Sequence, residues 1–215
     1  MTQHARKETG MNDKFFDLPK EKQERIINAG FRVFSRNSYK KSPVQQIADE
    51  AGISKSLLFF YFKNKKELFL FLMKKVEEIT TQALLASKCY EASNIFDMMY
   101  LGLQAKVGIM KDYPDITNFS VKAYYDDDPD IRDDVRKIVQ PYTQLETNQS
   151  IPPLDPKDFK EGIDLRLMYR DMYLASEGYI WQMSQTGVID VARILQEYKE
   201  MIDFWRELYA RKENT

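Results

Sequence analysis

The chain of 215 residues has little of the chemistry on which most hydrolytic enzymes and zinc sites depend. It contains one cysteine, Cys89, and one histidine, His4. No internal disulfide can form, and a Ser–His–Asp triad, a Cys–His pair or a zinc site would need residues that the chain lacks. The aspartate-rich stretch 126–130 lacks the glycine and the distal glutamate of a calcium loop, so we expect a solvated turn there. We therefore expect no catalytic site, no metal and no cofactor, and the cysteine count fits the reducing cytoplasm.

Long apolar runs are also missing. No stretch reaches 18 consecutive apolar residues, so the sequence predicts no transmembrane helix. The first 20 residues are polar and charged and lack the apolar centre of a secretory signal. Glycine and proline number 8 each, which excludes collagen-like and low-complexity classes, whereas 43% hydrophobic residues supply material for a core.

The formal net charge of −1 conceals an uneven distribution. Residues 1–75 contain 16 Lys and Arg against 8 Asp and Glu, whereas residues 76–215 contain 16 against 25. The basic residues 1–75, which we call the basic front, precede an acidic body, so an anionic partner is expected for the front alone. Nucleic acid and an anionic membrane surface both fit that description.

Apolar residues recur with a helical period in nearly every segment, and no segment alternates with a period of two. The sequence therefore predicts an all-α fold. Residues 1–16 are expected to be a disordered leader, and the natural start is open between Met1 and Met11. We expect helices over residues 19–35, 44–51, 55–62, 65–86, 94–110, 114–125, 130–145, 157–185 and 188–211.

Residues 43–62 have the spacing of a helix-turn-helix, with a short helix, a tight turn and a second short helix. Ser42 followed by Gln45 is a capping-box pattern for the first helix. Gly52 stands where a left-handed residue ends that helix, and Ser54 can cap the second one. In such a unit the second helix lies in the major groove of DNA.

The second short helix has two different faces. Leu58 and Phe62 are four residues apart and can face the core. The opposite face and its margin carry Lys55, Ser56, Phe59, Phe60 and Tyr61. Exposed aromatic rings are costly unless a partner covers them, and such rings can pack on thymine methyl groups. Two alternatives stay open: the aromatic rings pack on neighbouring helices, or the whole unit is a core fragment without a role in nucleic-acid binding.

Residues 25–72, centred on the run from Gly52 to Leu68, resemble the DNA-binding domain of the TetR family of transcriptional regulators. The resemblance implies a three-helix DNA-binding domain at 17–64, after the leader, and a larger helical domain at 65–215 for ligand binding and dimerisation. Residues 65–86 would form the helix that connects them. The DNA contacts implied by the motif and the resemblance are Ser42, Gln45, Lys55, Ser56, Phe59, Phe60, Tyr61 and Lys65.

The sequence departs from the family pattern at two positions. Phe59 stands where the family often has tyrosine, and Leu57 where it often has threonine. Each departure removes a hydroxyl that can contact DNA, so the resemblance supports the fold more firmly than the affinity or the preferred bases.

Residues 88–185 are rich in methionine and aromatic residues, most of which fit an ordinary helical core. The resemblance implies a ligand pocket among these helices, and flexible methionines suit an adaptable pocket for an apolar or flat molecule. From their helical phase, the residues expected to line it are Met99, Leu103, Phe119, Tyr124, Tyr169 and Tyr173.

Apolar stripes also run along the last two predicted helices and suit a four-helix bundle between two subunits. The stripes contain Leu174, Gly178 and Trp181 on one helix and Leu195, Tyr198, Ile202 and Trp205 on the other. The alternative is that both stripes pack within a single chain. The resemblance favours the homodimer, which would present two reading helices to a palindromic site on double-stranded DNA.

The sequence as a whole predicts a cytoplasmic, homodimeric, sequence-specific DNA-binding regulator. A repressor that a small-molecule effector releases from its operator is favoured over an activator. Two alternatives belong to other classes of protein: an enzyme that uses carboxylates and tyrosines of the helical body, and an interaction module whose basic front binds a membrane surface.

Overall fold

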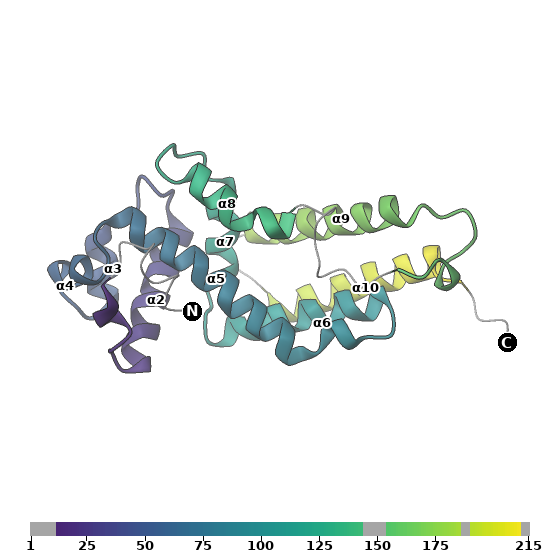
Figure 1. Ribbon diagram of the computed structural model, residues 1–215, viewed down its shortest axis with the longest axis horizontal. Coiled ribbons are helices and arrows are strands. Elements are labelled where there is room, and N and C mark those ends of the chain that lie inside the picture. The colour runs from purple at the N-terminus through teal and green to yellow at the C-terminus, as the bar shows by residue number, and fades with distance from the viewer. Residues whose placement is uncertain (1–11, 144–153, 186–189, 212–215) are drawn as a thin grey trace. The chain divides into compact units, whose positions relative to one another are not determined.

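The computed structural model describes residues 12–143, 154–185 and 190–211, and these residues form helices without a strand (Figure 1). The all-α fold predicted from the sequence is therefore confirmed. Among the described residues, no helix is both long and apolar enough to cross a membrane. The α-helices are α2 (Lys20–Arg36), α3 (Val44–Ala51), α4 (Lys55–Tyr61), α5 (Lys65–Ser87), α6 (Ile95–Gly108), α7 (Ile116–Tyr125), α8 (Arg132–Thr143), α9 (Leu165–Gln185) and α10 (Val191–Tyr209).

The chain divides into two compact units. The first contains residues 1–79 and 110–141, and the second contains residues 80–109 and 142–215. Helices α7 and most of α8 thus belong with the helix-turn-helix, although they follow it by more than 40 residues in the sequence. The functional boundary predicted after residue 64 stays a prediction, because the packing follows a different division.

Aromatic rings form the centre of the first unit. Phe34 lies against Phe69 with ring centroids 4.9 Å apart, and Phe119 of α7 lies 5.1 Å from Phe31 and 5.3 Å from Phe69. All four side chains are buried. Because α7 covers α2 in this way, the helices predicted to bind DNA share their core with a helix that the sequence had assigned to the ligand-binding body.

The helix-turn-helix forms where its local signals predict it. Gly52 ends α3 with φ 68°, a left-handed conformation that glycine adopts without steric cost. Ser54 then caps α4, its Oγ accepting a hydrogen bond from the Leu57 amide at 3.1 Å. The predicted capping role of Ser42 is wrong. Its Oγ donates to the Ser38 carbonyl at 2.9 Å, because Ser42 closes a preceding turn instead of facing α3.

The structure differs from the predicted leader at residues 12–16. Residues 13–15 form a 3-10 helix, η1 (Asp13–Phe15), and the Phe15 side chain is fully buried. The predicted disorder is therefore wrong for residues 12–16, because a phenylalanine ring buries apolar area when a site for it exists. Residues 1–11 lie outside the described part of the chain.

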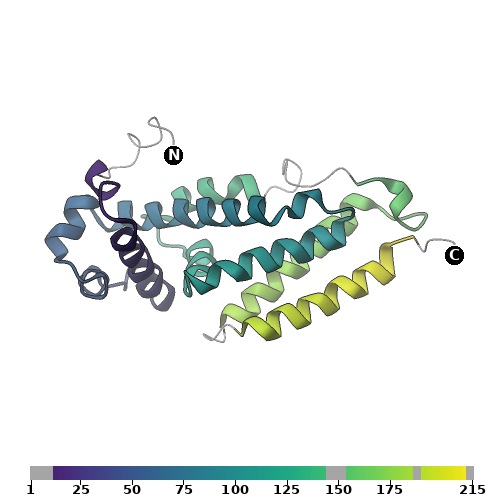
Figure 2. The same ribbon diagram turned by 90° about the horizontal axis from the view of Figure 1, so that it is seen from below.

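The second unit packs α6, α9 and α10 along one another (Figures 1 and 2). The helix predicted from residue 157 begins only at Leu165. Phe159 is buried, and the Lys160 amide donates to the Tyr209 carbonyl at 2.9 Å. This pairing with the end of α10 and the left-handed Gly162 (φ 82°) keep residues 159–164 out of a helix.

Candidate nucleic-acid interface

The predicted reading helix α4 has one buried face and one exposed face. Leu58 is fully buried, and Phe62, just after the helix, is too. The opposite face presents Lys55 and Ser56 as exposed side chains, and Phe60 is 54% exposed. A ring of that size in solvent on a two-turn helix is a feature that a binding partner would explain.

Phe59 lies between the two faces of α4 and is half-buried. The Lys55 ammonium sits 5.8 Å from the centroid of its ring. A cation at this distance is attracted to the face of an aromatic ring. Lys55 and Phe59 therefore form a joined cationic and apolar surface, which suits the phosphates and methyl groups of a DNA groove.

The sequence had predicted that Tyr61 lies at the margin of the exposed face, and this prediction is wrong. Tyr61 is 5% exposed, and its ring packs edge-on against Phe15 at 5.9 Å and Phe60 at 5.6 Å. The helix ends at this residue, where the leader covers it. Tyr61 therefore supports the exposed Phe60 ring, and little of its own surface is left for a partner.

The two predicted contacts near the start of α3 differ from each other. Ser42 is 3% exposed, with its hydroxyl engaged by the Ser38 carbonyl, so its side chain is not available to DNA. Gln45 is exposed, and its Nε2 donates to Asp49 Oδ1 at 2.8 Å. Of the two side chains, only Gln45 can turn toward a partner without losing a buried hydrogen bond.

Lys65 at the start of α5 is held in place by its surroundings. Its Nζ donates to the Lys40 carbonyl at 3.1 Å and lies 4.8 Å from the centroid of the Tyr39 ring. Burial lowers the pKa of Lys65, against the opposing effect of Asp128 and Asp126. The ammonium is therefore positioned before any phosphate approaches, which reduces the entropy that binding would cost.

The aspartate-rich stretch forms the turn between α7 and α8 and contacts the loop between α2 and α3. Asp126 Oδ2 accepts a hydrogen bond from the Tyr39 amide at 2.7 Å, and Asp126 Oδ1 accepts one from the Asp128 amide at 3.1 Å. Burial, and then Asp130 and Asp128, raise the pKa of Tyr39 to about 12. The carboxylates thus accept hydrogen bonds from backbone amides, and the stretch forms a turn, as the sequence predicted.

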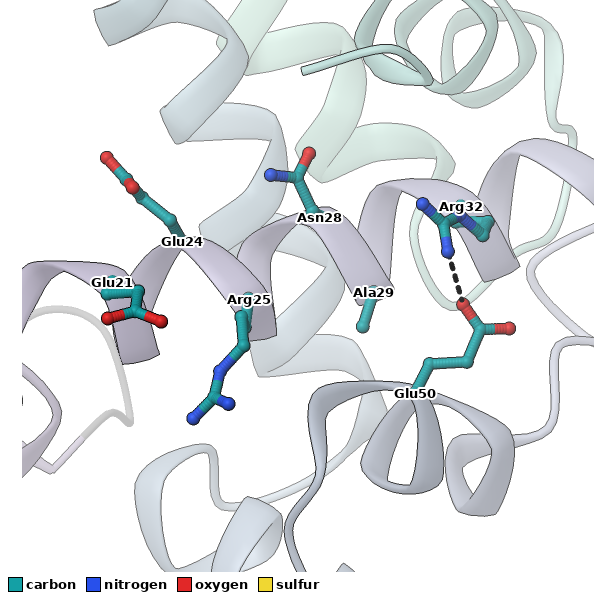
Figure 3. A pocket seen from close by; sticks show the side chains of 7 residues that line it. All are labelled: Glu21, Glu24, Arg25, Asn28, Ala29, Arg32 and Glu50. Atoms are coloured by element: carbon teal, nitrogen blue, oxygen red, sulfur yellow. Dashed lines mark ion pairs between the residues drawn. The ribbon is translucent and has the colours of Figure 1, made fainter. Parts of the chain in front are cut away.

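A cavity of about 340 Å³ opens on the surface of α2 and is lined mostly by charged side chains (Figure 3). Arg32 reaches across it to Glu50, with 3.6 Å between the guanidinium and the carboxylate. None of the six residues predicted to bind an apolar ligand lines this cavity. The lining residues are Glu21, Glu24, Arg25, Asn28, Ala29, Arg32 and Glu50.

The predicted ligand residues fall in both units. In the second unit, Leu103 belongs to the buried core, and Met99 and Tyr169 pack partly buried against it. Burial, then Tyr198 and Tyr90, raise the pKa of Tyr169 to about 12, so its hydroxyl stays protonated.

Tyr173 in the second unit is half-buried. In the first unit, Tyr124 is exposed. Phe119 is a core residue of that unit and packs against Phe31 and Phe69, so its place in a ligand pocket stays a prediction.

The residues predicted to form the dimer seam differ in how far they are exposed in the single chain. Tyr198, Ile202 and Trp205 are buried in the core of their own chain. This burial removes them from the seam, because a side chain packed inside one subunit cannot also contact a second. Leu195 is half-buried against the same core, whereas Leu174, Gly178 and Trp181 are exposed on α9.

Sequence patterns missed the contacts that the leader makes. Phe15 packs on the end of α4, and the Asn12 amide donates to the Tyr61 carbonyl at 2.9 Å. The one available signal was the pair Phe15–Phe16, because adjacent aromatic residues are unusual in a solvated polar segment.

Comparisons with known proteins agree with the geometry. Residues 26–72 match the family described as "Bacterial regulatory proteins, tetR family". The chain is 42% identical over 50 residues to the uncharacterized HTH-type transcriptional regulator YerO of Bacillus subtilis, a match that covers 23% of this chain and 17% of that protein. It is 30% identical over 114 residues to the HTH-type transcriptional regulator RutR of Escherichia coli K12, covering 53% and 51%. The chain thus spans about half or less of the length of these relatives.

Solved structures extend the likeness to most of the fold. A TetR family transcriptional regulator from Chloroflexus aurantiacus J-10-FL superimposes with a TM-score of 0.65 at 20% identity, covering 94% of this chain and 99% of that one. FadR from Bacillus subtilis, solved in complex with stearoyl-CoA, gives 0.59 at 18% identity, covering 83% and 96%. Residues 26–72 thus match the DNA-binding region of the TetR family of helix-turn-helix transcriptional regulators, and the fold of the chain resembles that of solved TetR family members.

Proposed function

We propose that this protein is a cytoplasmic transcriptional regulator that binds a palindromic DNA operator as a homodimer. The observation that supports it best is the exposed face of α4, where Lys55, Ser56 and the 54% exposed Phe60 ring stand on a buried scaffold. Lysine and serine can reach phosphates and base edges, and an aromatic ring can pack on thymine methyl groups. Parts of this chain are 42% identical to YerO and 30% identical to RutR, both of which are named HTH-type transcriptional regulators.

The homodimer would form through exposed apolar side chains of α9 and α10. Leu167, Leu174 and Trp181 recur every seven residues along α9, which places them on one stripe with Gly178 beside it. Phe204 and Leu208, four residues apart, give α10 an apolar face as well. A second copy of the chain would cover these side chains and hold two reading helices about 34 Å apart, one turn of DNA.

The effector is proposed to be a molecule with a long apolar chain. The core of the second unit contains Met98, Met168, Met172 and Met183, and methionine side chains adapt to ligands of irregular shape. FadR of Bacillus subtilis was solved with stearoyl-CoA, and the fatty acid metabolism regulator of the same organism is 22% identical to this chain over 147 residues. A long-chain acyl-CoA is therefore the first effector to test.

Repression is the mode that we favour. A ligand shifts the balance between a DNA-binding and a released state only by its different affinity for the two. An acyl-CoA that binds the released state better would free the operator.

Fluorescence anisotropy tests the proposal. The purified protein is titrated into labelled DNA from upstream of its own gene and into scrambled DNA of equal length, across a salt series. Preferential, steeply salt-dependent binding is expected, and stearoyl-CoA should release the operator more than free coenzyme A does. Equal binding to both DNAs at every salt concentration would reject sequence-specific recognition, and an unchanged complex would reject the acyl effector.

A further inference from the structure

The predicted reading helix depends on contacts at both of its ends. Helix α4 has only seven residues, and isolated helices of fewer than about 12 residues are marginal in water. At its start, the Ser54 hydroxyl caps the Leu57 amide. At its end, the last carbonyls of a helix have no partner inside the helix and must find one elsewhere.

Residues 12–18, which we name the anchor segment, supply that partner. The Asn12 amide donates to the Tyr61 carbonyl, the last of α4, at 2.9 Å. The fully buried ring of Phe15 lies beside the same helix end, with centroid distances of 5.9 Å to Tyr61 and 5.0 Å to Phe62. It also lies 5.2 Å from Phe71 of α5. The segment therefore joins the end of α4 to the next helix.

The anchor segment is itself fixed to α2. Gln23 Nε2 donates to the Leu18 carbonyl at 2.8 Å and to the Phe16 carbonyl at 3.3 Å. The Asn12 side chain caps the short helix η1 by accepting from the Lys14 amide at 3.0 Å. The segment is thus held on one side by α2 while it holds the end of α4 on the other.

Aromatic rings continue from the anchor segment to the exposed face of α4. Phe15 contacts Tyr61, and Tyr61 contacts Phe60 with 5.6 Å between centroids. A rotation of α4 about its axis would break this series of contacts. The orientation of Phe60 toward a groove is therefore coupled to the burial of Phe15, outside the helix-turn-helix itself.

We propose that Asn12 and Phe15 are positioning residues for DNA reading: they fix the rotation of α4, so that losing them lowers the selectivity for the operator before it unfolds the protein. The proposal rests on the proposed DNA-binding function. Non-specific binding depends on phosphate contacts and tolerates small rotations, whereas base contacts do not. Selectivity is therefore the property that the anchor segment should control.

A pair of substitutions at Asn12 isolates the hydrogen bond to α4. Asn12 has φ −82°, which proline also adopts, so Asn12→Pro removes the amide proton without a different backbone conformation. Asn12→Ala is the matched control, because both variants lose the side-chain cap and only proline loses the N–H. In the full-length chain, operator affinity should fall about three- to tenfold further for Asn12→Pro than for Asn12→Ala. Equal affinities of the two variants would overturn the role of this bond.

A second pair separates positioning from stability. Phe15→Leu is compared with Phe119→Leu, since both rings are fully buried in the first unit, Phe15 lies against Tyr61 of α4, and the rings beside Phe119 belong to α2 and α5. Both variants should melt at lower temperature. Only Phe15→Leu should lower the ratio of operator affinity to scrambled-DNA affinity, by about tenfold. Equal ratios at a temperature where both variants are folded would overturn the proposal.

Hydrogen exchange of the free protein gives a readout that does not need DNA. Phe15→Leu should speed exchange of the amides of α4 relative to those of α3, and Phe119→Leu should not. If the unaltered protein showed no operator preference, the proposed function would be rejected. The exchange comparison would still test whether the anchor segment holds α4 in place. If the amides of α4 exchanged at an unchanged rate in Phe15→Leu, the positioning role of the anchor segment would be rejected, even if DNA binding were confirmed.

Discussion

Single residues show how closely the helices of the first unit approach. At Gly30 of α2, an added Cβ would lie 2.5 Å from Leu72 Cδ1, and Leu72 is fully buried. Overpacking a filled core costs about 1–3 kcal/mol, which exceeds the gain of up to about 1 kcal/mol that alanine brings to a helix. We expect Gly30→Ala to lower the free energy of unfolding by about 1 kcal/mol, measured by urea denaturation.

Gly108→Ala is the control for this substitution, because a Cβ there meets nothing within 4 Å. It should leave the stability unchanged or raise it by up to about 1 kcal/mol. Equal losses at both positions would show that contact with Leu72 is not the cause.

The stability of the second unit should depend on the charge of Asp97. Burial acts to raise the pKa of this carboxyl, but hydrogen bonds from Arg206 and Asn94 outweigh it and lower the pKa overall. Arg206 lies 2.7 Å away. Because the folded pKa is below the unfolded one, the stabilisation is complete above the unfolded pKa of about 3.9 and is lost as the pH falls through the folded pKa.

Asp97→Asn should therefore melt below the unaltered protein at pH 7, and the difference should shrink below about pH 4. Melting temperatures from pH 2.5 to 8 measure this. A difference that stays constant over that range would mean that packing, not charge, accounts for the loss.

At the scale of single elements, Lys65 begins α5 and is predicted to contact a phosphate. Lys65→Ala should weaken binding to all DNA sequences alike and reduce the slope of log affinity against log salt by about one. Lys66→Ala is the adjacent control, because the Lys66 ammonium is paired with Asp134 at 2.7 Å. If Lys66→Ala changed the slope as much as Lys65→Ala does, the phosphate contact could not be assigned to Lys65.

Helix α4 should contribute through Phe60 to the choice of bases. Phe60→Ala is expected to cost about 1–3 kcal/mol on the operator and less on scrambled DNA, as anisotropy titrations would measure. Since Phe60 is largely exposed, the melting temperature should change little. Equal losses on both DNAs would make Phe60 a backbone contact.

Element boundaries were predictable where their signals are local. Gly52 and Ser54 mark the turn before α4 by their own conformational preferences, and both lie where the sequence placed them. The start of α9 was not predictable, because residues 159–164 leave the helix to pair with Tyr209 and Ala210. The predicted cap at Ser42 was wrong for a similar reason, because its hydroxyl donates to the Ser38 carbonyl of the preceding turn.

At the scale of the whole molecule, the proposed homodimer can be tested by adding charge. Phe204 is 61% exposed on α10, and Phe204→Glu should give folded monomers in sedimentation velocity. Trp205, the adjacent residue, is buried in its own chain, so Trp205→Glu should unfold the second unit, as near-UV circular dichroism would show. An intact dimer of Phe204→Glu would place the interface elsewhere.

The candidate site was predictable on α4 and largely unpredictable around it. Helical phase correctly predicted that Leu58 is buried and Phe60 exposed, because both residues lie on one regular helix. Phase could not tell that Phe119 belongs to the core of the first unit or that Trp205 faces its own chain, since an apolar stripe looks the same whether it packs within a chain or between chains.

The division of the chain into units has a consequence for building hybrid regulators. The polypeptide passes between the two units after residues 79, 109 and 141, so neither unit is one continuous stretch. A graft of residues 12–72 onto a foreign sensor would carry the whole family motif and leave behind α7, whose Phe119 closes the core over Phe31. The aromatic core therefore decides which segments can be exchanged between regulators. A working chimera must include residues 110–141 together with the helix-turn-helix.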